Sequence, residues 1–376
     1  MRRSGMATVY GYSLSIHYKS SRLVRMETIS IVGGGIAGLA LAACLEPGRF
    51  EVTVYEKRPE LPTVGTVLAM WPNAQRALAR IGILGQARAV SPILGSGSVR
   101  NAAGEAWLTV NGGELIGMSR VDLLRLLDTA VPATVRRVTS EVQELPAGEG
   151  LVVGADGVHS VVRRRAWGPA ADARVTSCLA LRGTIPAPVD PDAVGEYWGR
   201  GDLFGIAASP GGTNWYASWR SALGPTGIDV EQALKQARER FAGHAPAIRQ
   251  VLAAAVPELS LAQRIWTTPP LRSYVRGAAV LVGDAAHAMT PNLGRGACES
   301  LVDAVTLADL LNSLPQERAL AAYNRQRRLR TRALSRASAA MMRVAMAERA
   351  QPLRDRLLDL ARRRDERAAA GKSAGN

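Results

Sequence analysis

The sequence predicts an α/β fold in three parts: an α/β domain assembled from separate stretches of chain, an antiparallel β-sheet domain inserted into it, and helices at the C-terminus. Three observations favour this fold. Residues 28–56 have the pattern strand, helix, strand, which is typical of a βαβ crossover. Residues 175–219 form short alternating runs separated by Pro and Gly, a pattern typical of antiparallel strands. From residue 297 onward, apolar residues recur at helical spacing.

The first unit carries a glycine motif between its strand and its helix. Gly33, Gly35 and Gly38 have the G-x-G-x-x-G spacing, in which the first glycine allows a tight turn and the second lets a pyrophosphate approach the backbone. The third lets helix and strand pack closely, and Glu56 ends the second strand where a carboxylate can accept hydrogen bonds from ribose hydroxyls. This unit predicts a dinucleotide site but does not distinguish FAD from NAD.

Two later segments also follow short apolar strands. Asp156-Gly157-Val158-His159-Ser160 comes after residues 151–155, and Gly283-Asp284-Ala285-Ala286-His287 comes after residues 280–282. The second is followed by Pro291, Gly294 and Gly296, which open a predicted helix. In their order and setting, the three segments resemble the FAD-contacting segments of the flavoprotein aromatic hydroxylases, the single-component monooxygenases similar to p-hydroxybenzoate hydroxylase.

The resemblance implies a role for each matching residue. Asp284 would hydrogen-bond a ribityl hydroxyl of FAD, and Asp156 and Gly157 would lie near the pyrophosphate and the approach of the nicotinamide. The loop of Pro291, Gly294 and Gly296 would lie along the flavin ring, where a helix N-terminus stabilises the negative charge of reduced flavin. Arg120 would reach the pyrophosphate and ribityl region. The expected cofactor-binding residues are Gly33, Gly35, Gly38, Glu56, Arg120, Asp156, Gly157, Gly283, Asp284, Pro291, Gly294 and Gly296.

The implied reaction is hydroxylation of an electron-rich aromatic substrate. NAD(P)H would reduce bound FAD, O2 would add to give a C4a-hydroperoxyflavin, and its distal oxygen would go to the substrate. No catalytic side chain is assigned, because the flavin does the chemistry. No second G-x-G-x-x-G unit follows a strand, so NADH or NADPH would dock transiently. Aromatic residues of the inserted sheet are the expected substrate contacts: Tyr197, Trp198, Tyr216 and Trp219.

Three alternatives stay open. Within the same chemistry, the enzyme could epoxidise an isolated double bond, and a flavin-dependent oxidase or reductase would form no productive hydroperoxide. The third alternative is a non-catalytic FAD-binding partner protein. It is motivated by residues 128–153, which are shorter than the β-meander that such relatives carry.

The expected organisation is therefore a discontinuous Rossmann-like FAD-binding domain, an inserted antiparallel substrate domain and C-terminal helices. We expect residues 1–25 to be a disordered extension, with Met26 as a possible start of the working protein. Residues 26–70, 98–172 and 270–315 would form the FAD-binding domain, 71–97 and 173–269 the substrate domain, and 316–376 the C-terminal helices and basic tail.

Composition excludes several other functions. The net charge of +15 lies in residues 1–25 and 317–376, and the remaining body is neutral. No aromatic residues alternate with the terminal arginines, so a nucleic-acid site is not expected. No apolar run is long enough to span a membrane. Cys44, Cys178 and Cys298 lack metal or redox spacing, which predicts buried, reduced thiols in a cytoplasmic protein without a metal site.

A few further residues have structural roles in this interpretation. We expect His159 and His287 to serve packing and hydrogen bonding, and Glu299 to have a structural role in the first turn of its helix, where an anion is stabilised. Cys298 could instead anchor a flavin covalently. The chain would be a monomer or homodimer, because apolar positions in the C-terminal helices would pack on the body or on a second subunit: Met341, Ala345, Leu353, Leu357 and Leu360.

Overall fold

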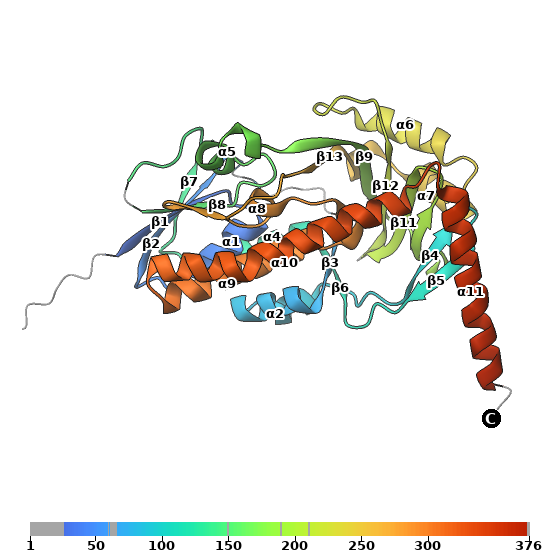
Figure 1. The fold of residues 1–376 in the computed structure, drawn as a ribbon, viewed down its shortest axis with the longest axis horizontal. Helices are drawn as coiled ribbons and strands as arrows, with labels where there is room; N and C mark the ends of the chain where they lie inside the picture. Colours follow the sequence, from blue (N-terminus) through green and yellow to red (C-terminus); the bar gives the residue numbers. More distant parts are fainter. Residues whose placement is uncertain are drawn as a thin grey trace, which may run out of the picture.

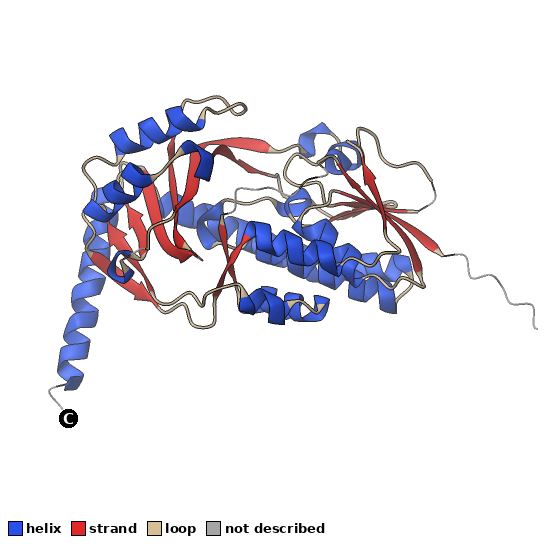
Figure 2. Ribbon diagram, turned by 180° about the vertical axis from the view of Figure 1, so that it is seen from behind, coloured by secondary structure: helices blue, strands red, loops and turns tan. Residues whose placement is uncertain are grey.

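The computed structural model describes residues 26–58, 60, 66–148, 150–188, 190–209 and 211–373. The predicted disorder of residues 1–25 lies outside this part of the chain. The two large β-sheets lie at opposite ends of the molecule, and the long helix α10 (Gln316–Ala345) runs alongside both of them (Figures 1 and 2).

The first sheet is assembled from distant parts of the chain. Its six strands have the order β14-β15-β8-β1-β2-β7, and every neighbouring pair is parallel except β14–β15. Their bounds are β1 (Glu27–Val32), β2 (Phe50–Glu56), β7 (Arg136–Thr139), β8 (Leu151–Gly154), β14 (Val275–Arg276) and β15 (Ala279–Leu281). The central strands are apolar and buried, as strands of a parallel sheet covered on both faces are.

Helices cover this sheet and complete the main hydrophobic core. Helices α1 and α9 pack against each other. The helices of this domain are α1 (Ile36–Cys44), α2 (Pro72–Ile81), α3 (Leu84–Ala89), α4 (Arg120–Ala130), α5 (Val161–Trp167), α8 (Asp284–His287) and α9 (Gly296–Ser313). Short 3-10 turns lie at η1 (Pro169–Ala171), η2 (Pro191–Ala193), η3 (Pro257–Leu259) and η4 (Pro291–Leu293).

The second sheet has seven strands in the order β13-β9-β12-β11-β10-β4-β5. All its pairs are antiparallel, as expected, except the parallel pair β10–β4. The bounds are β4 (Gly97–Asn101), β5 (Ala106–Val110), β9 (Arg174–Ile185), β10 (Gly195–Trp198), β11 (Asp202–Ser209), β12 (Gly212–Arg220) and β13 (Ser260–Thr267).

The two faces of the second sheet have different environments. Helices α6 (Val230–Arg240) and α7 (Pro246–Ala254) cover one face with a core that includes Phe204, Trp215 and Phe241. The opposite face, here called the inner face, looks toward the first domain. There Asn214 Oδ1 accepts a hydrogen bond of 3.1 Å from Val67 N of β3 (Val67–Met70), which pairs with β6 (Ile116–Ser119).

The predicted domain boundaries need correction between residues 71 and 110. Residues 71–97 were expected in the substrate domain, but α2 and α3 bury Ala74, Leu78 and Ala87 in the main core beside α9 and α4. Conversely, β4 and β5 extend the second sheet, although residues 98–172 were assigned to the FAD-binding domain. Amphipathic helices carry no signal for which domain they cover, and β4 and β5 are too short to reveal their pairing partner.

Between the end of α4 and the start of β8, the described residues form one strand, β7, which pairs with β2 at the edge of the first sheet. The strands that lead into the three glycine segments, β15, β8 and β1, are neighbours in this order in the first sheet.

The C-terminal helix α11 (Gln351–Ser373) projects from the end of α10 (Figure 1). Ala345 is fully buried, as expected, and Leu358 packs against the inner face of the second sheet. Leu353, Leu357 and Leu360 do not pack on the body, since they are 61%, 58% and 54% exposed. None of the helices in the described part of the chain combines the length and apolarity needed to cross a membrane.

Candidate functional site

In the glycine turn after β1, two of the three motif glycines are tightly packed and the third, Gly35, is not. Gly33 has φ +106°, and a Cβ there would lie 2.4 Å from the Ala155 carbonyl oxygen. A Cβ on Gly38 would lie 1.9 Å from the Gly33 oxygen, so the helix can approach the strand only at glycine. A Cβ on Gly35 would meet no described atom within 4 Å. The turn therefore leaves space at the one glycine where a ligand is expected.

Glu56 lies beside this turn, at the end of β2. Its Oε2 accepts a hydrogen bond of 2.7 Å from Gly34 N, and its Oε1 accepts one of 2.9 Å from Arg58 N. The two backbone donors fix the carboxylate at the edge of the open space. Each oxygen keeps a further lone pair for a hydroxyl donor.

Asp156 follows β8 and adjoins the same turn, because a Cβ on Gly33 would lie 2.8 Å from the Asp156 Cα. Its Oδ2 accepts from Val161 N (2.7 Å) and Val162 N (3.2 Å), which fixes the start of α5. Its Oδ1 is buried without a hydrogen-bond partner among the described residues. Burial raises the pKa of the Asp156 carboxyl. Gly157, with φ +77°, makes the turn that places this carboxylate.

Arg163 fastens the second glycine segment to the third. Its side chain is almost fully buried and donates to the carbonyl oxygens of Ala171 (2.6 Å), Ala285 and Ala286 (2.9 Å each), and Pro269. Burial lowers the pKa of Arg163 to about 10. The sequence places Arg163 just after the Asp156–Ser160 segment but does not reveal that its side chain joins this segment to Ala285 and Ala286.

Gly283 and Asp284 form the third segment. Gly283 has φ +60°, and a Cβ there would lie 2.7 Å from Ser300 Oγ, so the chain turns sharply between β15 and α8 only with glycine. Asp284 is exposed at the start of α8. Its Oδ1 would lie 3.8 Å from a Cβ placed on Gly296, so the carboxylate faces the beginning of α9.

The loop before α9 presents unpaired polar groups. Gly294 is left-handed with φ +59°, and α9 begins at Gly296 without a side-chain cap. Arg295 lies 5.0 Å from the ring centre of Trp71. Three buried atoms here lack partners among the described residues: Trp71 Nε1, Asn292 Oδ1 and Arg295 Nε. Buried polar atoms are usually paired, so this loop is built to meet a ligand or ordered water.

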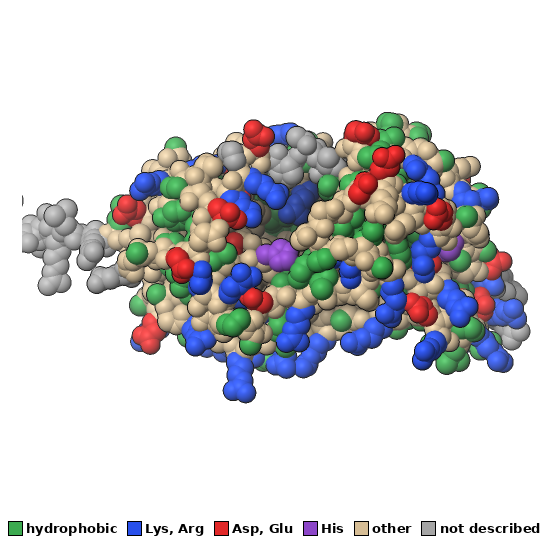
Figure 3. All heavy atoms as spheres, turned by 90° about the horizontal axis from the view of Figure 1, so that it is seen from above, with side chains coloured by type: hydrophobic (Ala, Val, Ile, Leu, Met, Phe, Trp, Pro, Cys, Tyr) green, Lys and Arg blue, Asp and Glu red, His purple; other side chains and the backbone are tan. Residues whose placement is uncertain are grey.

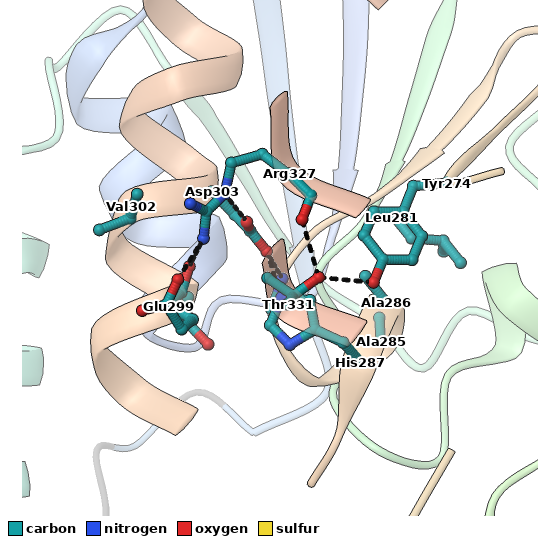
Figure 4. Close-up of polar contacts among 12 residues, drawn as sticks. Tyr274, Leu281, Ala285, Ala286, His287, Glu299, Val302, Asp303, Arg327 and Thr331 are labelled. Carbon is teal, nitrogen blue, oxygen red and sulfur yellow. Dashed lines mark hydrogen bonds and ion pairs between the residues drawn. The ribbon is translucent and has the colours of Figure 1, made fainter. Parts of the chain in front are cut away.

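A buried ionic network supports the third segment from behind (Figure 4). Asp303 accepts hydrogen bonds from Gly283 N (2.9 Å), His287 Nε2 (2.6 Å) and Arg327 Nε (2.6 Å). Arg327 also donates to Glu299 Oε2 at 2.6 Å. Burial alone would raise the pKa of Asp303, but the charges of His287 and Arg327 hold that pKa below its ordinary value. The network fixes the turn that presents Asp284.

Asp303 and Arg327 are not identified from the sequence. Their only signal is that Glu299 and Asp303 lie one turn apart in an otherwise apolar helix, a spacing that places two carboxylates on one buried face. Glu299 does have the structural role expected of it, since Arg295 Nη2 and Asn73 Nδ2 also donate to its Oε1.

The other predicted residues of this region lie in packed surroundings. His287 is buried in the ionic network, and His159 packs edge-on against Trp266 with ring centres 4.6 Å apart. Burial lowers the pKa of His159. Cys44, Cys178 and Cys298 are buried free thiols. Cys298 is fully buried with its Sγ 3.2 Å from the Ala69 oxygen, which does not favour a covalent flavin anchor.

The inner face of the second sheet carries a polar row. Tyr216 donates to Glu196 Oε2 at 2.8 Å, and Trp198 Nε1 donates to Glu196 Oε1 at 2.5 Å. The Tyr216 ring reaches across the strand between them, where a Cβ on Gly205 would lie 2.0 Å from it. Burial of the hydroxyl and the Glu196 charge raise the pKa of Tyr216 well above its ordinary value. Burial raises the pKa of Glu196 as well.

Arg182 continues this row, because it stands opposite Tyr216 in the β9–β12 register. Its Nε is buried and has no partner among the described residues. Burial, and then the nearby charge of Arg120, lower the pKa of Arg182 to about 10. Arg120 itself is exposed at the start of α4. Figure 3 shows Lys and Arg side chains inside a hollow near the middle of the molecule.

The structure corrects the expected substrate residues. Tyr197 and Trp219 lie on the opposite face, in the core beneath α6 and α7, where they are 2% and 3% exposed. Trp198 is on the inner face but packs between Trp107 and Arg354, so it reaches the row only through its bond to Glu196. Of the four, Tyr216 alone is open to the space between the domains. The described residues contain no group of three or more His, Cys, Asp or Glu side chains suited to a metal ion.

The chain matches two family models. Residues 121–338 match a family described as FAD binding domain, and residues 31–64 match one described as NAD(P)-binding Rossmann-like domain. Aurachin C monooxygenase/isomerase of Stigmatella aurantiaca is 30% identical over 312 residues, covering 76% of this chain and 80% of that protein. The 2-heptyl-3-hydroxy-4(1H)-quinolone synthase of Pseudomonas aeruginosa is 30% identical over 334 residues, covering 81% and 85%.

The fold is also similar to that of solved structures. Klebsiella pneumoniae HpxO, complexed with FAD and uric acid, superposes with a TM-score of 0.78 at 23% identity, over 90% of this chain and 93% of that one. The strand orders and the discontinuous first domain described above are therefore an arrangement that an FAD-binding protein is known to adopt.

Proposed function

This chain belongs to the FAD-dependent monooxygenases that hydroxylate aromatic substrates, and we propose that the space between its two sheets is where it does so. NAD(P)H and O2 are the co-substrates of this reaction. One observation carries the proposal: three segments from distant parts of the chain meet at the open side of Gly35, the exposed Asp284 and the uncapped start of α9.

The residues around this opening suit FAD. Gly33, Gly35 and Gly38 would admit the pyrophosphate to the start of α1, and Glu56 would accept hydrogen bonds from the adenosine ribose. Asp284 would face the ribityl chain, with Gly283 holding it in place. Asp156 Oδ1, buried and unpaired, needs a donor that a bound cofactor or its water can supply. Arg120 and Gly157 would border the same space.

Bound FAD would supply the electron transfer from NAD(P)H and the activation of O2. The protein would supply position and charge. The Gly294 amide already donates to Pro291 O, but the uncapped start of α9 at Gly296 would stabilise negative charge beside the flavin, and the loop from Pro291 would shape the wall. The inner face of the second sheet would close the side of the space that lies opposite the first domain, and it would thereby exclude water from the reacting ring.

The polar row defines what the substrate must offer. Because the Tyr216 hydroxyl donates to Glu196, the Tyr216 oxygen remains free to accept a hydrogen bond from the substrate. Arg182, with its unpaired Nε, can donate to an oxygen of the substrate. We therefore infer an aromatic ring that carries a hydroxyl or N–H donor and a nearby carbonyl or carboxylate oxygen. The relatives' quinolone and hydroxybenzoate names describe rings of this kind.

The experiment is to purify the chain, record its flavin absorption, and follow NADH and NADPH oxidation with hydroxybenzoates and 4-quinolones. We expect a yellow protein, substrate-stimulated oxidation and a product heavier by one oxygen atom. A protein that cannot be reconstituted with FAD would refute the proposal. Peroxide release without product would favour an oxidase or reductase, and flavin that NAD(P)H never reduces would favour the non-catalytic alternative.

A further inference from the structure

A small cavity of about 140 Å³ lies behind the third glycine segment, between the loop from Thr268 to Leu271 and helix α10. Three buried polar atoms of residues lining it lack hydrogen-bond partners among the described residues: His287 Nδ1, Thr268 Oγ1 and Arg332 Nε. They come from three separate segments of the chain. A cluster of unpaired buried polar atoms around one cavity calls for a bound polar group.

The lining also indicates the charge of that group. Arg336 and Ser335 of α10 complete the polar wall, and no Asp or Glu is among the described residues that line the cavity. Arg332 can only donate hydrogen bonds, and the hydroxyls of Thr268 and Ser335 can donate. The volume corresponds to the space of about four or five water molecules, which suits a phosphate, sulfate or carboxylate group.

His287 determines whether the cavity presents only donors. Its Nε2 lies 2.6 Å from Asp303 Oδ2, and that carboxylate also accepts from Arg327, so Nε2 carries a proton. Figure 4 shows the other ring nitrogen pointing away from Asp303. When His287 is an imidazolium, Nδ1 is a donor and the cavity is lined by donors from three segments. When His287 is neutral, Nδ1 is a hydrogen-bond acceptor, and its lone pair would repel a bound anion.

We propose that this cavity is a binding site for a small oxyanion group, held by His287, Thr268 and Arg332 with Arg336 and Ser335 at its wall. The site is separate from the proposed flavin site but connected to it. His287 bonds Asp303, and Asp303 bonds the backbone N–H of Gly283, which precedes Asp284. An anion that fixes His287 therefore also fixes the turn that presents Asp284.

Affinity for the anion should fall as pH rises, because binding requires the His287 imidazolium. The charged groups that face His287 are Asp303 and Asp284, which raise its pKa, and Arg327, which lowers it, while Arg332 and Arg336 approach from α10. Tyr274 lies beside it with ring centres 6.0 Å apart. Burial alone lowers the pKa of His287, but Asp303 outweighs burial and the net shift is upward.

The test is binding of inorganic phosphate and sulfate to the FAD-loaded protein, measured by calorimetry and ³¹P NMR at about pH 6 and about pH 9. We expect saturable binding that weakens at the higher pH and is reduced at least about tenfold in R332Q/R336Q. The matched control is R330Q, an exposed arginine of α10 that does not line the cavity, which should bind as the wild type does.

A second arm distinguishes a free anion from a phosphate of the reductant, and it alone rests on the proposed function. If the 2′-phosphate of NADPH occupies the site, R332Q/R336Q raises the KM for NADPH but not for NADH, and phosphate competes with NADPH. If both KM values are unchanged while phosphate binding is lost, the ligand is a free anion. The proposal is wrong if neither phosphate, sulfate nor NADPH binds in a manner that depends on Arg332 and Arg336; the cavity then holds water.

Discussion

Arg163 illustrates at the scale of one residue what a sequence motif does and does not reveal. It lies three residues after the Asp156–Ser160 segment, yet its carbonyl partners at Ala285 and Ala286 lie more than 120 positions later in the chain. Motif glycines are predictable because a positive φ or a close contact permits no other residue. An arginine in a helix looks the same in sequence whether it is solvated or buried, so Arg163 and Arg327 could not be assigned.

The first prediction concerns the polar row on the inner face. Tyr216→Phe should lower kcat/KM for the aromatic substrate by about tenfold, because the substrate loses an acceptor and Glu196 loses a donor. Product formation under NAD(P)H-saturating conditions measures this. The matched control is Tyr197→Phe, whose hydroxyl bonds Ala193 O in the opposite core. Equal losses in the two variants would remove Tyr216 from the substrate site.

The second prediction concerns pH and the His287–Asp303 pair. The pKa of His287 is raised above its ordinary 6.5, so its contribution is complete below about pH 6.5 and is lost as pH rises through the folded pKa. The pKa of Asp303 is lowered below 3.8, so its contribution is complete above that value and is lost only as pH falls further. The pair thus stabilises the fold most between these limits.

His287→Gln tests this window, because glutamine can still donate to Asp303 but cannot carry charge. The difference in Tm between wild type and variant should be larger at about pH 6 than at about pH 9. Thermal unfolding monitored by circular dichroism in buffers of matched ionic strength measures it. A difference that is independent of pH would mean that the pKa of His287 is the same in the folded and the unfolded protein, and a difference that is larger at about pH 9 would mean that His287 is neutral in the folded protein.

At the scale of elements, the local sequence pattern predicts whether a segment is a helix or a strand better than it predicts which other elements that segment packs against. The β1–α1–β2 unit is recognisable because strand, glycine turn and helix are contiguous, and the structure contains it as expected. The period of two in β10 and β12 predicts strands with two faces, but not which face is covered. The covered face is the one on which helices α6 and α7 pack, and these helices come later in the chain. They bury Tyr197 and Trp219, while Tyr216 lies on the inner face.

The third prediction separates the two kinds of glycine in this unit. Gly35 has φ −81°, and a Cβ there meets no described atom, so Gly35→Ala should fold with unchanged Tm. The added methyl would occupy the space left for the pyrophosphate, and FAD affinity should fall at least about tenfold. Flavin fluorescence titration of the apoprotein measures this. Gly48→Ala, in an exposed turn with equal space, is the control and should change neither quantity.

Gly33→Ala is the counterpart, because its Cβ would lie 2.4 Å from the Ala155 oxygen at a φ of +106°. We expect this variant to lose stability as well as FAD. If Gly35→Ala also unfolds, or if it binds FAD as tightly as wild type, the open side of the turn is not the cofactor site.

At the scale of the whole molecule, the proposed site is a space between two sheets that are held together from outside. Helix α10 spans both domains: Tyr323 donates to Leu281 O of β15, and Met342, together with Met346 just after the helix, packs on the second sheet. Helix α11 contacts the second sheet through Arg354, which donates to Gly199 O and lies over the Trp198 ring. Composition predicts basic C-terminal helices, but not that one of their arginines is an internal anchor, since fifteen other basic residues in this region share its pattern.

The last prediction tests that anchor. Arg354 lies 5.7 Å from the Trp107 ring centre and 5.8 Å from that of Trp198, and it donates to Ala345 O at 2.6 Å and Gly199 O at 3.1 Å. Arg354→Gln keeps a polar side chain but loses the charge over both rings and most of these bonds, which should cost about 2–3 kcal/mol of unfolding free energy. Urea unfolding measures it, with the exposed Arg356→Gln as the control.

Trp198 packs against Arg354 and also donates to Glu196, so loss of the Arg354 contacts should displace Trp198 and, through it, Glu196 on the inner face. We therefore expect Arg354→Gln to raise the substrate KM as well, while FAD affinity, which depends on the first domain, stays unchanged. Loss of stability together with loss of FAD would instead mean that the two sheets unfold as one unit, and that α11 anchors the whole molecule rather than the substrate wall.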